Sequence, residues 1–213
     1  MMKSSQEELN TLTNDIDIQL EAATLTQSLS SIPLNAYSGA HRPNAETSAL
    51  AAEAGGLDKL KEMTTAFYAK AFVNPQLDQF IRSHDDPHGS RFASWIAEKM
   101  GLGTPWSDER RTRQTCPFSS HGHQFETPHD RSSAHYAAWH SPKRTPEKFG
   151  VHFKLDDCRT WMRLHFWSCR EVGLFDTPFG DYYVKFIAHF VSVCKFKFKY
   201  EFRWYMYVCL LFF

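Results

Sequence analysis

The sequence predicts an all-α fold with five or six helices around one core. Apolar residues recur at spacings of three and four in several segments, which is the period of a helix with one buried face. Proline and glycine residues separate these segments, and no segment before residue 194 alternates polar and apolar residues as a strand does. The length of 213 residues suits one domain with tails.

The N-terminal part predicts an arm followed by a first long helix. Residues 1–48 are polar and rich in Ser, Thr, Gln and Asn, so we expect a flexible arm. Gly55-Gly56 separates this arm from the next segment. The apolar residues of that segment have helical spacing: Leu57, Leu60, Met63, Phe67 and Phe72. Asn74-Pro75 ends this helix because the residue before proline avoids the helical conformation. One more helical turn then carries Leu77, Phe80 and Ile81.

The middle of the chain predicts a second strong helix and then a loop. His84-Asp-Asp-Pro87 is a typical helix entry, with Pro87 suited to the first turn. The helix that follows has a face made of Phe92, Trp95, Ile96 and Met100. Gly101-Leu-Gly103 ends it, as glycine commonly does. Residues 104–130 are rich in Pro, Ser, Thr and Arg, and they predict a loop.

The C-terminal half predicts three further helices. Asp130 can cap a short helix that reaches Trp139 and that Pro142 and Pro146 end. A longer helix starts at Asp156-Asp157 and runs to about Gly173, and Pro178 starts a last one. We therefore expect an arm over residues 1–48, one helical domain over 49–193, and a tail over 194–213 for which the sequence suggests no packed structure.

Composition and charge exclude several function classes. The 24 acidic residues balance the 24 Lys and Arg residues, so no basic field favours nucleic acid or an anionic membrane surface. The five cysteines are odd in number and show no CxxC spacing, which favours a reducing, cytoplasmic compartment. The sequence has no signal-peptide pattern at its start and no apolar run that predicts a membrane span.

Aromatic and histidine residues predict the chemistry of a site. The chain has 18 Phe, 6 Trp and 11 His, which favours a pocket for a large flat ligand with a nitrogen ligand at its edge. His88, Phe92 and Trp95 share one helix face at positions i, i+4 and i+7. Together with Phe67-Tyr68 on the first helix and a histidine beyond them, this face suits a haem whose iron takes an axial nitrogen.

The same residues, in the same order, resemble a known family. The motifs are Gly55-Gly56, Phe67-Tyr68, Asn74-Pro75 with Leu77 and Phe80, the helix over residues 92–101, and Trp161-Met-Arg-Leu. They resemble the truncated (2/2) haemoglobins, and most closely the group with a tryptophan in the penultimate helix. The resemblance covers residues 50–193. It implies a globin-like 2/2 helical sandwich with a long inserted loop, which makes the predicted helical domain a haem domain.

The resemblance implies roles for individual residues. Tyr68 matches the distal tyrosine that donates a hydrogen bond to bound ligand, and His88 falls at a second distal position. Leu155 matches the last residue of a Phe-Pro-Ile segment that follows the proximal histidine. The complete set of expected haem contacts is Tyr68, Phe80, His88, Phe92, Leu155 and Trp161. The implied function is the binding of O2 or another diatomic gas with haem as cofactor, and NO oxidation or peroxide chemistry would need a reductase partner.

The proximal iron ligand has two candidates, His140 and His152. In this family, the number of residues between this histidine and the tryptophan is larger than that between His152 and Trp161 and smaller than that between His140 and Trp161. His140 requires an inserted loop, Ser141–Gly150, whereas His152 leaves little chain to turn into the next helix. Insertions in surface loops cost little free energy, whereas a connection that is too short cannot reach, so the sequence separation favours His140. Lys143, Arg144 and Lys154 are candidates to pair with haem propionates.

Two other interpretations compete with haem. The aromatic residues are also ordinary core residues of a helical protein, so the chain could be a haem-free globin-like module for interaction or regulation. A second cluster in the predicted loop offers zinc ligands at Cys116, His121, His123, His129 and His135. Their spacing matches no common zinc motif, which disfavours a structural zinc site. No serine triad, paired-carboxylate site or phosphate-binding glycine loop occurs.

Overall fold

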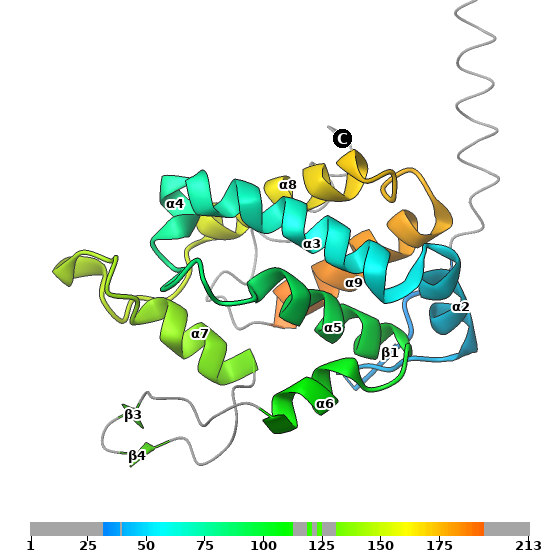
Figure 1. Cartoon of the computed structure of the whole chain (residues 1–213), viewed down its shortest axis with the longest axis horizontal. Helices are drawn as coiled ribbons and strands as arrows, with labels where there is room; N and C mark the ends of the chain where they lie inside the picture. Colours follow the sequence, from blue (N-terminus) through cyan, green and yellow to red (C-terminus); the bar gives the residue numbers. More distant parts are fainter. Residues whose placement is uncertain (1–31, 39, 113–118, 121–122, 125–130, 194–213) are drawn as a thin grey trace, which may run out of the picture. The chain divides into compact units, whose positions relative to one another are not determined.

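A computed structural model describes residues 32–38, 40–112, 119–120, 123–124 and 131–193 of the chain. Almost all of these residues belong to one unit, which begins at Leu34. Apart from two hairpins with strands of two residues each, the regular structure of the described part is helical (Figure 1). The predicted all-α class is confirmed.

The helical unit begins upstream of residue 49, the boundary that we expected. Strands β1 (Ala36–Tyr37) and β2 (Ala40–His41) pair as an antiparallel hairpin, and helix α2 (Ala45–Glu53) follows. Asn44 caps α2 through reciprocal hydrogen bonds with Thr47. The Thr47 hydroxyl also donates to the carbonyl oxygen of Met100 over 2.9 Å, which ties α2 to a helix far along the chain. Strands of two residues are too short to produce an alternating pattern in the sequence.

The first long helix and its end agree with the prediction. Helix α3 (Gly56–Val73) starts after Gly55, whose φ of 101° is one that residues with side chains rarely adopt. Helix α4 (Pro75–Asp78) is the predicted extra turn, but of the expected apolar residues it contains only Leu77, and Phe80 and Ile81 follow it. The Asn74 side chain accepts hydrogen bonds from the backbone N–H groups of the first turn of α4, so this residue ends one helix and caps the next.

Helix α5 (His88–Met100) is the second strong helix, and Pro87 lies just before it rather than in its first turn. The predicted loop over residues 104–130 was wrong in its first part, because Pro105–Thr112 forms helix α6. None of the residues of α6 is buried, so this helix has no apolar period to detect. A tertiary contact holds it instead, since the Glu98 carboxylate on α5 accepts hydrogen bonds from the backbone N–H and the hydroxyl of Ser107.

The remaining elements follow the predicted order. Strands β3 (Ser119–Ser120) and β4 (His123–Gln124) form the second small hairpin, and helix α7 (Arg131–Trp139) comes next. A short 3₁₀ turn, η1 (Pro146–Lys148), leads to helices α8 (Leu155–Glu171) and α9 (Pro178–Val193). The predicted cap at Asp130 and the tail over 194–213 lie outside the described residues.

Helix α3 lies at the centre of the core and packs against α5 and α8 (Figure 1). Its residues Leu60, Met63 and Phe67 are buried, as are Ile96 and Met100 on α5. Helices α8 and α9 add further buried side chains: Met162, Phe166, Tyr182, Tyr183, Phe186 and Ile187. Each of the large apolar side chains stabilises the fold by about 1.5–3 kcal/mol through its burial.

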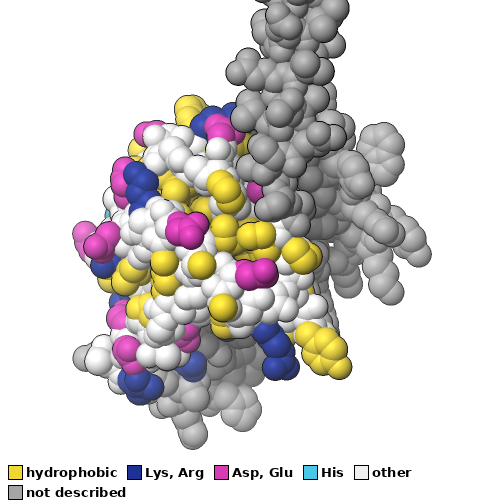
Figure 2. Space-filling model, turned by 90° about the vertical axis from the view of Figure 1, so that its right-hand side faces the viewer, with side chains coloured by type: hydrophobic (Ala, Val, Ile, Leu, Met, Phe, Trp, Pro, Cys, Tyr) yellow, Lys and Arg dark blue, Asp and Glu magenta, His cyan; other side chains and the backbone are white. Residues whose placement is uncertain are grey.

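Charges of both signs are interspersed on one face of the described unit. Figure 2 shows one face, on which Lys and Arg side chains lie between Asp and Glu side chains and small groups of hydrophobic ones. Of the helices that the structure describes, none is both long enough and apolar enough to cross a bilayer.

Candidate functional site

The predicted site residues form two groups, and the first lies on α3, α5 and α8. The Phe67 ring contacts the rings of Tyr68 and Trp161, with centroids 5.0 Å and 5.5 Å away. Phe92 on α5 contacts Trp161 at 5.9 Å. Phe67 is buried, whereas Tyr68, Phe92 and Trp161 are half-buried. The group is therefore an aromatic face whose base is part of the core and whose outer rings keep exposed surface.

Tyr68 is a neutral hydrogen-bond donor in this group. Burial raises the pKa of its hydroxyl to about 12, so the proton stays on the oxygen at physiological pH. Among the described residues, none forms a hydrogen bond with this hydroxyl. The Tyr68 ring stacks on the His88 ring, with centroids 5.3 Å apart and planes 23° apart. The stack restricts the orientation of the phenol ring, and the O–H has no acceptor among the described residues.

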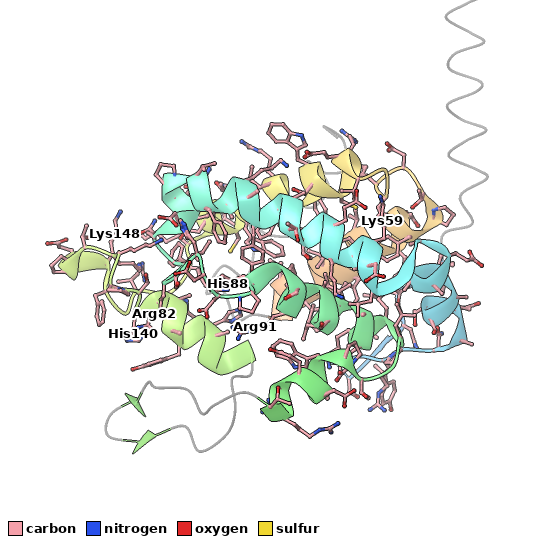
Figure 3. All side chains as sticks on the ribbon, viewed as in Figure 1. Lys59, Arg82, His88, Arg91, His140 and Lys148 are labelled. Carbon is pink, nitrogen blue, oxygen red and sulfur yellow. The ribbon has the colours of Figure 1, made fainter. Side chains whose placement is uncertain are left out.

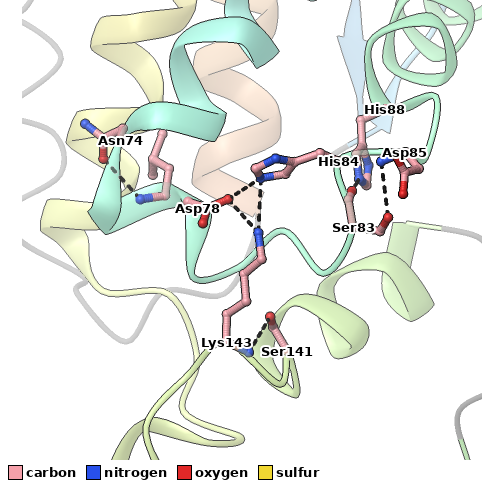
Figure 4. Close-up of polar contacts among 9 residues, drawn as sticks. Asn74, Asp78, Ser83, His84, Asp85, His88, Ser141 and Lys143 are labelled. Carbon is pink, nitrogen blue, oxygen red and sulfur yellow. Dashed lines mark hydrogen bonds and ion pairs between the residues drawn. The ribbon is translucent and has the colours of Figure 1, made fainter.

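His88 has a supporting role in this arrangement. Figure 3 places it at the start of α5, and its Nε2 lies 2.8 Å from the carbonyl oxygen of Ser83 (Figure 4). Because a carbonyl only accepts, Nε2 carries the proton and donates it. Burial lowers the pKa of His88, so the ring is neutral and its Nδ1 has no proton to offer a ligand. Tyr68 is thus the stronger donor of the expected distal pair.

The second group surrounds Phe80 and reaches α7. The Phe80 ring is buried and contacts the ring of Phe153 at 4.9 Å. Phe153 in turn contacts Trp139, the last residue of α7, at 5.8 Å. Two polar bonds join the helices beside these groups, since Gln76 on α4 hydrogen-bonds Asp157 and Thr160 at the start of α8.

Arg144 anchors the chain that follows α7. Its side chain is buried, and one guanidinium nitrogen donates to the carbonyl oxygens of Trp139 over 2.9 Å and of Val151 over 2.5 Å. The guanidinium also lies over the Phe80 ring, 4.5 Å from its centroid. Burial lowers the pKa of Arg144. These bonds close the predicted inserted loop, so Arg144 is engaged in holding the backbone.

Lys143 provides a second anchor for the same segment (Figure 4). Its ammonium lies 2.8 Å from a carboxylate oxygen of Asp78 on α4, and His84 lies 2.6 Å from the same oxygen. Burial alone would raise the pKa of Asp78, but the hydrogen bonds from Lys143 and His84 outweigh it and hold that pKa below its usual range. The loop is therefore attached to α4 by an ion pair as well as by rings.

The two predicted iron ligands have different surroundings. His140, at the end of α7 (Figure 3), donates from Nδ1 to the carbonyl oxygen of Tyr136 over 2.8 Å. This bond leaves Nε2 unprotonated, as metal-ligating histidines require. However, Nε2 faces Gly150, where an added Cβ would lie only 3.3 Å away. His152 is exposed and stacks flat on Trp139, with centroids 3.8 Å apart.

A third histidine, His135, lies closer to the predicted haem contacts than the sequence suggested. It is half-buried on α7, and its ring meets the Phe153 ring edge to face at 5.4 Å. Sequence reasoning assigned it only to the zinc cluster. Its spacing of four from Trp139 could have revealed this position, because residues i and i+4 share one helix face.

The remaining predicted site residues can be placed briefly. Leu155 is half-buried at the first position of α8. Cys116, His121 and His129 of the zinc hypothesis lie outside the described residues. Within the described ranges, no three His, Cys, Asp or Glu side chains group closely enough to hold a metal ion.

Comparison with known proteins adds no assignment. No protein-family model matches the chain, and no curated protein and no solved structure matches it. The functional interpretation therefore depends on the geometry of the two groups.

Proposed function

We propose that the chain is a haem-binding protein of the truncated-haemoglobin type that binds O2 or another diatomic gas. The observation that carries this proposal is the Tyr68 hydroxyl. It is neutral, has no hydrogen-bond partner among the described residues, and belongs to a ring that packs on Phe67, as the half-buried ring of Trp161 does. A donor beside an aromatic face is the arrangement that a polar ligand on a flat apolar cofactor requires.

The residues present fit a haem on both sides. Tyr68, Phe92 and Trp161 offer ring surface and a donor, and the segment from α7 to residue 154 offers three imidazoles. We propose that His135 would hold the iron of a bound haem, because His135 and Phe80 both contact the ring of Phe153. His140 and His152 are the alternatives. When bound, haem supplies an iron with an open coordination position for the gas.

The side chains of this chain then control the bound gas. The Tyr68 O–H donates to the ligand oxygen that carries partial negative charge, and the low-dielectric surroundings strengthen this bond. His88 holds the phenol by stacking, and Arg144 and Lys143 hold the opposite segment in place. Slow O2 release follows. A donor of this kind also polarises an O–O bond, so NO oxidation or peroxide turnover, with electrons from a reductase, is a secondary activity of the same proposal.

Titration of the purified full-length chain with haemin tests the proposal, followed by O2 release in stopped flow. We expect a saturable Soret band. Tyr68→Phe should raise the O2 off-rate about tenfold or more, because a hydrogen bond to a charged group contributes about 1.5–3 kcal/mol. The control Tyr37→Phe alters a tyrosine that is 70% exposed and should leave the rate unchanged.

Two results would contradict the proposal in different ways. An unchanged off-rate in Tyr68→Phe would refute the distal role of that residue. The absence of any Soret band would refute haem binding itself and favour the haem-free interaction module.

A further inference from the structure

Beneath the half-buried Trp161 lies a polar pair in the interior of the unit. The His165 ring, one helical turn along α8, stacks on the Trp161 ring with centroids 4.8 Å apart and planes only 7° apart. Its Nε2 lies 2.6 Å from the hydroxyl oxygen of Tyr183 on α9. His165 and Tyr183 are both 0% exposed. The three side chains form a continuous path from the aromatic face into the core.

The hydrogen-bond pattern defines the proton positions in this pair. His165 Nδ1 is buried and has no hydrogen-bond partner. If Nε2 carried the proton, both the phenol proton of Tyr183 and the lone pair on Nδ1 would lack partners. If Tyr183 donates to Nε2 instead, only the Nδ1 proton lacks one. The second arrangement is therefore favoured, with the Nδ1–H among the rings of Phe67 and Phe92.

Ionisation in the resting protein does not explain the pair. Burial lowers the pKa of His165 to about 3 and raises that of Tyr183 well above its usual value, so both groups are neutral. Packing does not explain it either, because apolar side chains of similar volume would avoid the unsatisfied buried donor. What the geometry provides is a phenol whose proton already faces a base, beside a stacked indole.

We propose that Tyr183 is a redox-active tyrosine that is oxidised through Trp161, with His165 as the acceptor of its phenolic proton. A one-electron oxidant first removes one electron from the Trp161 indole. Tyr183 then returns one electron to the indole, its O–H bond breaks, and the proton moves to His165 Nε2. The products are a neutral tyrosyl radical, an imidazolium ion and restored tryptophan. One electron leaves the protein, and no proton leaves it.

The identity of the physiological oxidant rests on the proposed function. In that proposal, a haem oxidised by a hydroperoxide would lie against Trp161 and would accept the electron. The relay moves the oxidising equivalent away from the ligand site into a dry part of the core. There a radical is protected from reductants in solution, which are excluded from a fully buried ring.

The chain contains a matched control for this relay. Tyr182, the neighbour of Tyr183, has a hydroxyl 2.7 Å from Nε2 of the buried His41. This second pair has the same chemistry and a similar hydrogen bond. Its imidazole contacts Phe186 and Phe190 rather than Trp161. Of these two tyrosines, only Tyr183 should therefore be oxidised after an electron has been removed from Trp161.

The test uses the full-length chain without haem, so its outcome is independent of the proposed function. Photogenerated tris(bipyridyl)ruthenium(III) supplies the oxidant, and electron paramagnetic resonance of frozen samples detects radicals. Ascorbate added after the flash removes radicals on exposed tyrosines. We expect a tyrosyl signal that resists ascorbate in the wild type and in Tyr182→Phe. We expect its loss in Tyr183→Phe, in Trp161→Phe and in His165→Gln, whose amide is not a base.

Persistence of the ascorbate-resistant signal in Tyr183→Phe would overturn the proposal, and so would its loss in Tyr182→Phe alone. Persistence in His165→Gln would overturn the role of His165. Circular dichroism checks that each variant is folded. If Tyr183→Phe does not fold, Trp161→Phe decides the matter, because an unchanged signal there means that the path does not begin at Trp161.

Discussion

The two sides of the candidate site are built in different ways. The face on α3, α5 and α8 is continuous with the core, where Phe67 is 1% exposed and Ile96 and Met100 are fully buried. The segment from α7 to Lys154 is held by ring contacts through Phe153, by the Arg144 bonds to backbone carbonyls and by the Lys143 ion pair. The aromatic face is thus part of the folded core, whereas the segment from α7 to Lys154, to which we assign the iron ligand in our proposal, is a separately attached layer.

The difference predicts unequal costs for truncating a phenylalanine on each side. Phe67→Ala should lower the free energy of unfolding by about 3–5 kcal/mol, because it opens a cavity in the core. Phe153→Ala removes a half-buried ring and should cost about 1–2 kcal/mol. Urea denaturation followed by circular dichroism measures both. Equal costs would mean that the α7 segment belongs to the same cooperative core.

The core side should also be sensitive to acid. Burial lowers the pKa of His165 to about 3 and, with nearby His189 and Lys99, that of His41 to about 4, from 6.5 for both in the unfolded chain. At mildly acidic pH the unfolded chain binds protons that the folded chain does not. The stabilisation is therefore fully present above pH 6.5 and is lost as pH falls. Between about pH 6.5 and pH 5, the proton that the unfolded chain takes up at each histidine should lower the free energy of unfolding by about 1.5 kcal/mol.

His165→Gln tests this expectation because it removes the titration of His165 and keeps that of His41. Urea denaturation at several pH values should give a shallower loss of stability for the variant than for the wild type. The interpretation of His165 as a buried neutral base would be wrong if both chains lost stability equally over this interval.

Much of the helical frame could be predicted from sequence. The spacing of Leu60, Met63 and Phe67 and the stop at Asn74-Pro75 predict α3 and its end, because both effects are local. Helix α6 was missed because its support is the tertiary contact between Glu98 and Ser107. The upstream boundary of the unit was missed for a similar reason, since the bond from Thr47 to Met100 joins residues far apart in the chain.

The candidate site was predictable to a smaller extent. Helical spacing predicts that Phe92 and Trp95 share one face, and their rings are in contact. The order of the motifs predicts that Trp161 lies near this face, and its ring contacts Phe92. The burial of Arg144 and the orientation of His140 toward Gly150 depend on how the loop folds back, which no local pattern records. The pair of His165 and Tyr183 depends on the crossing of α8 and α9.

The central claim is that a haem lies between the two sides, with its iron held by the α7 layer. Haemin titration of the wild type and of His135→Ala, His140→Ala and His152→Ala, each with and without added imidazole, tests it most directly. We predict a Soret band in the wild type, a changed band in His135→Ala that imidazole restores, and wild-type bands in the other two variants. Loss of ligation in His140→Ala or His152→Ala instead would contradict the axial assignment, and the absence of a Soret band in the wild type would contradict the claim itself.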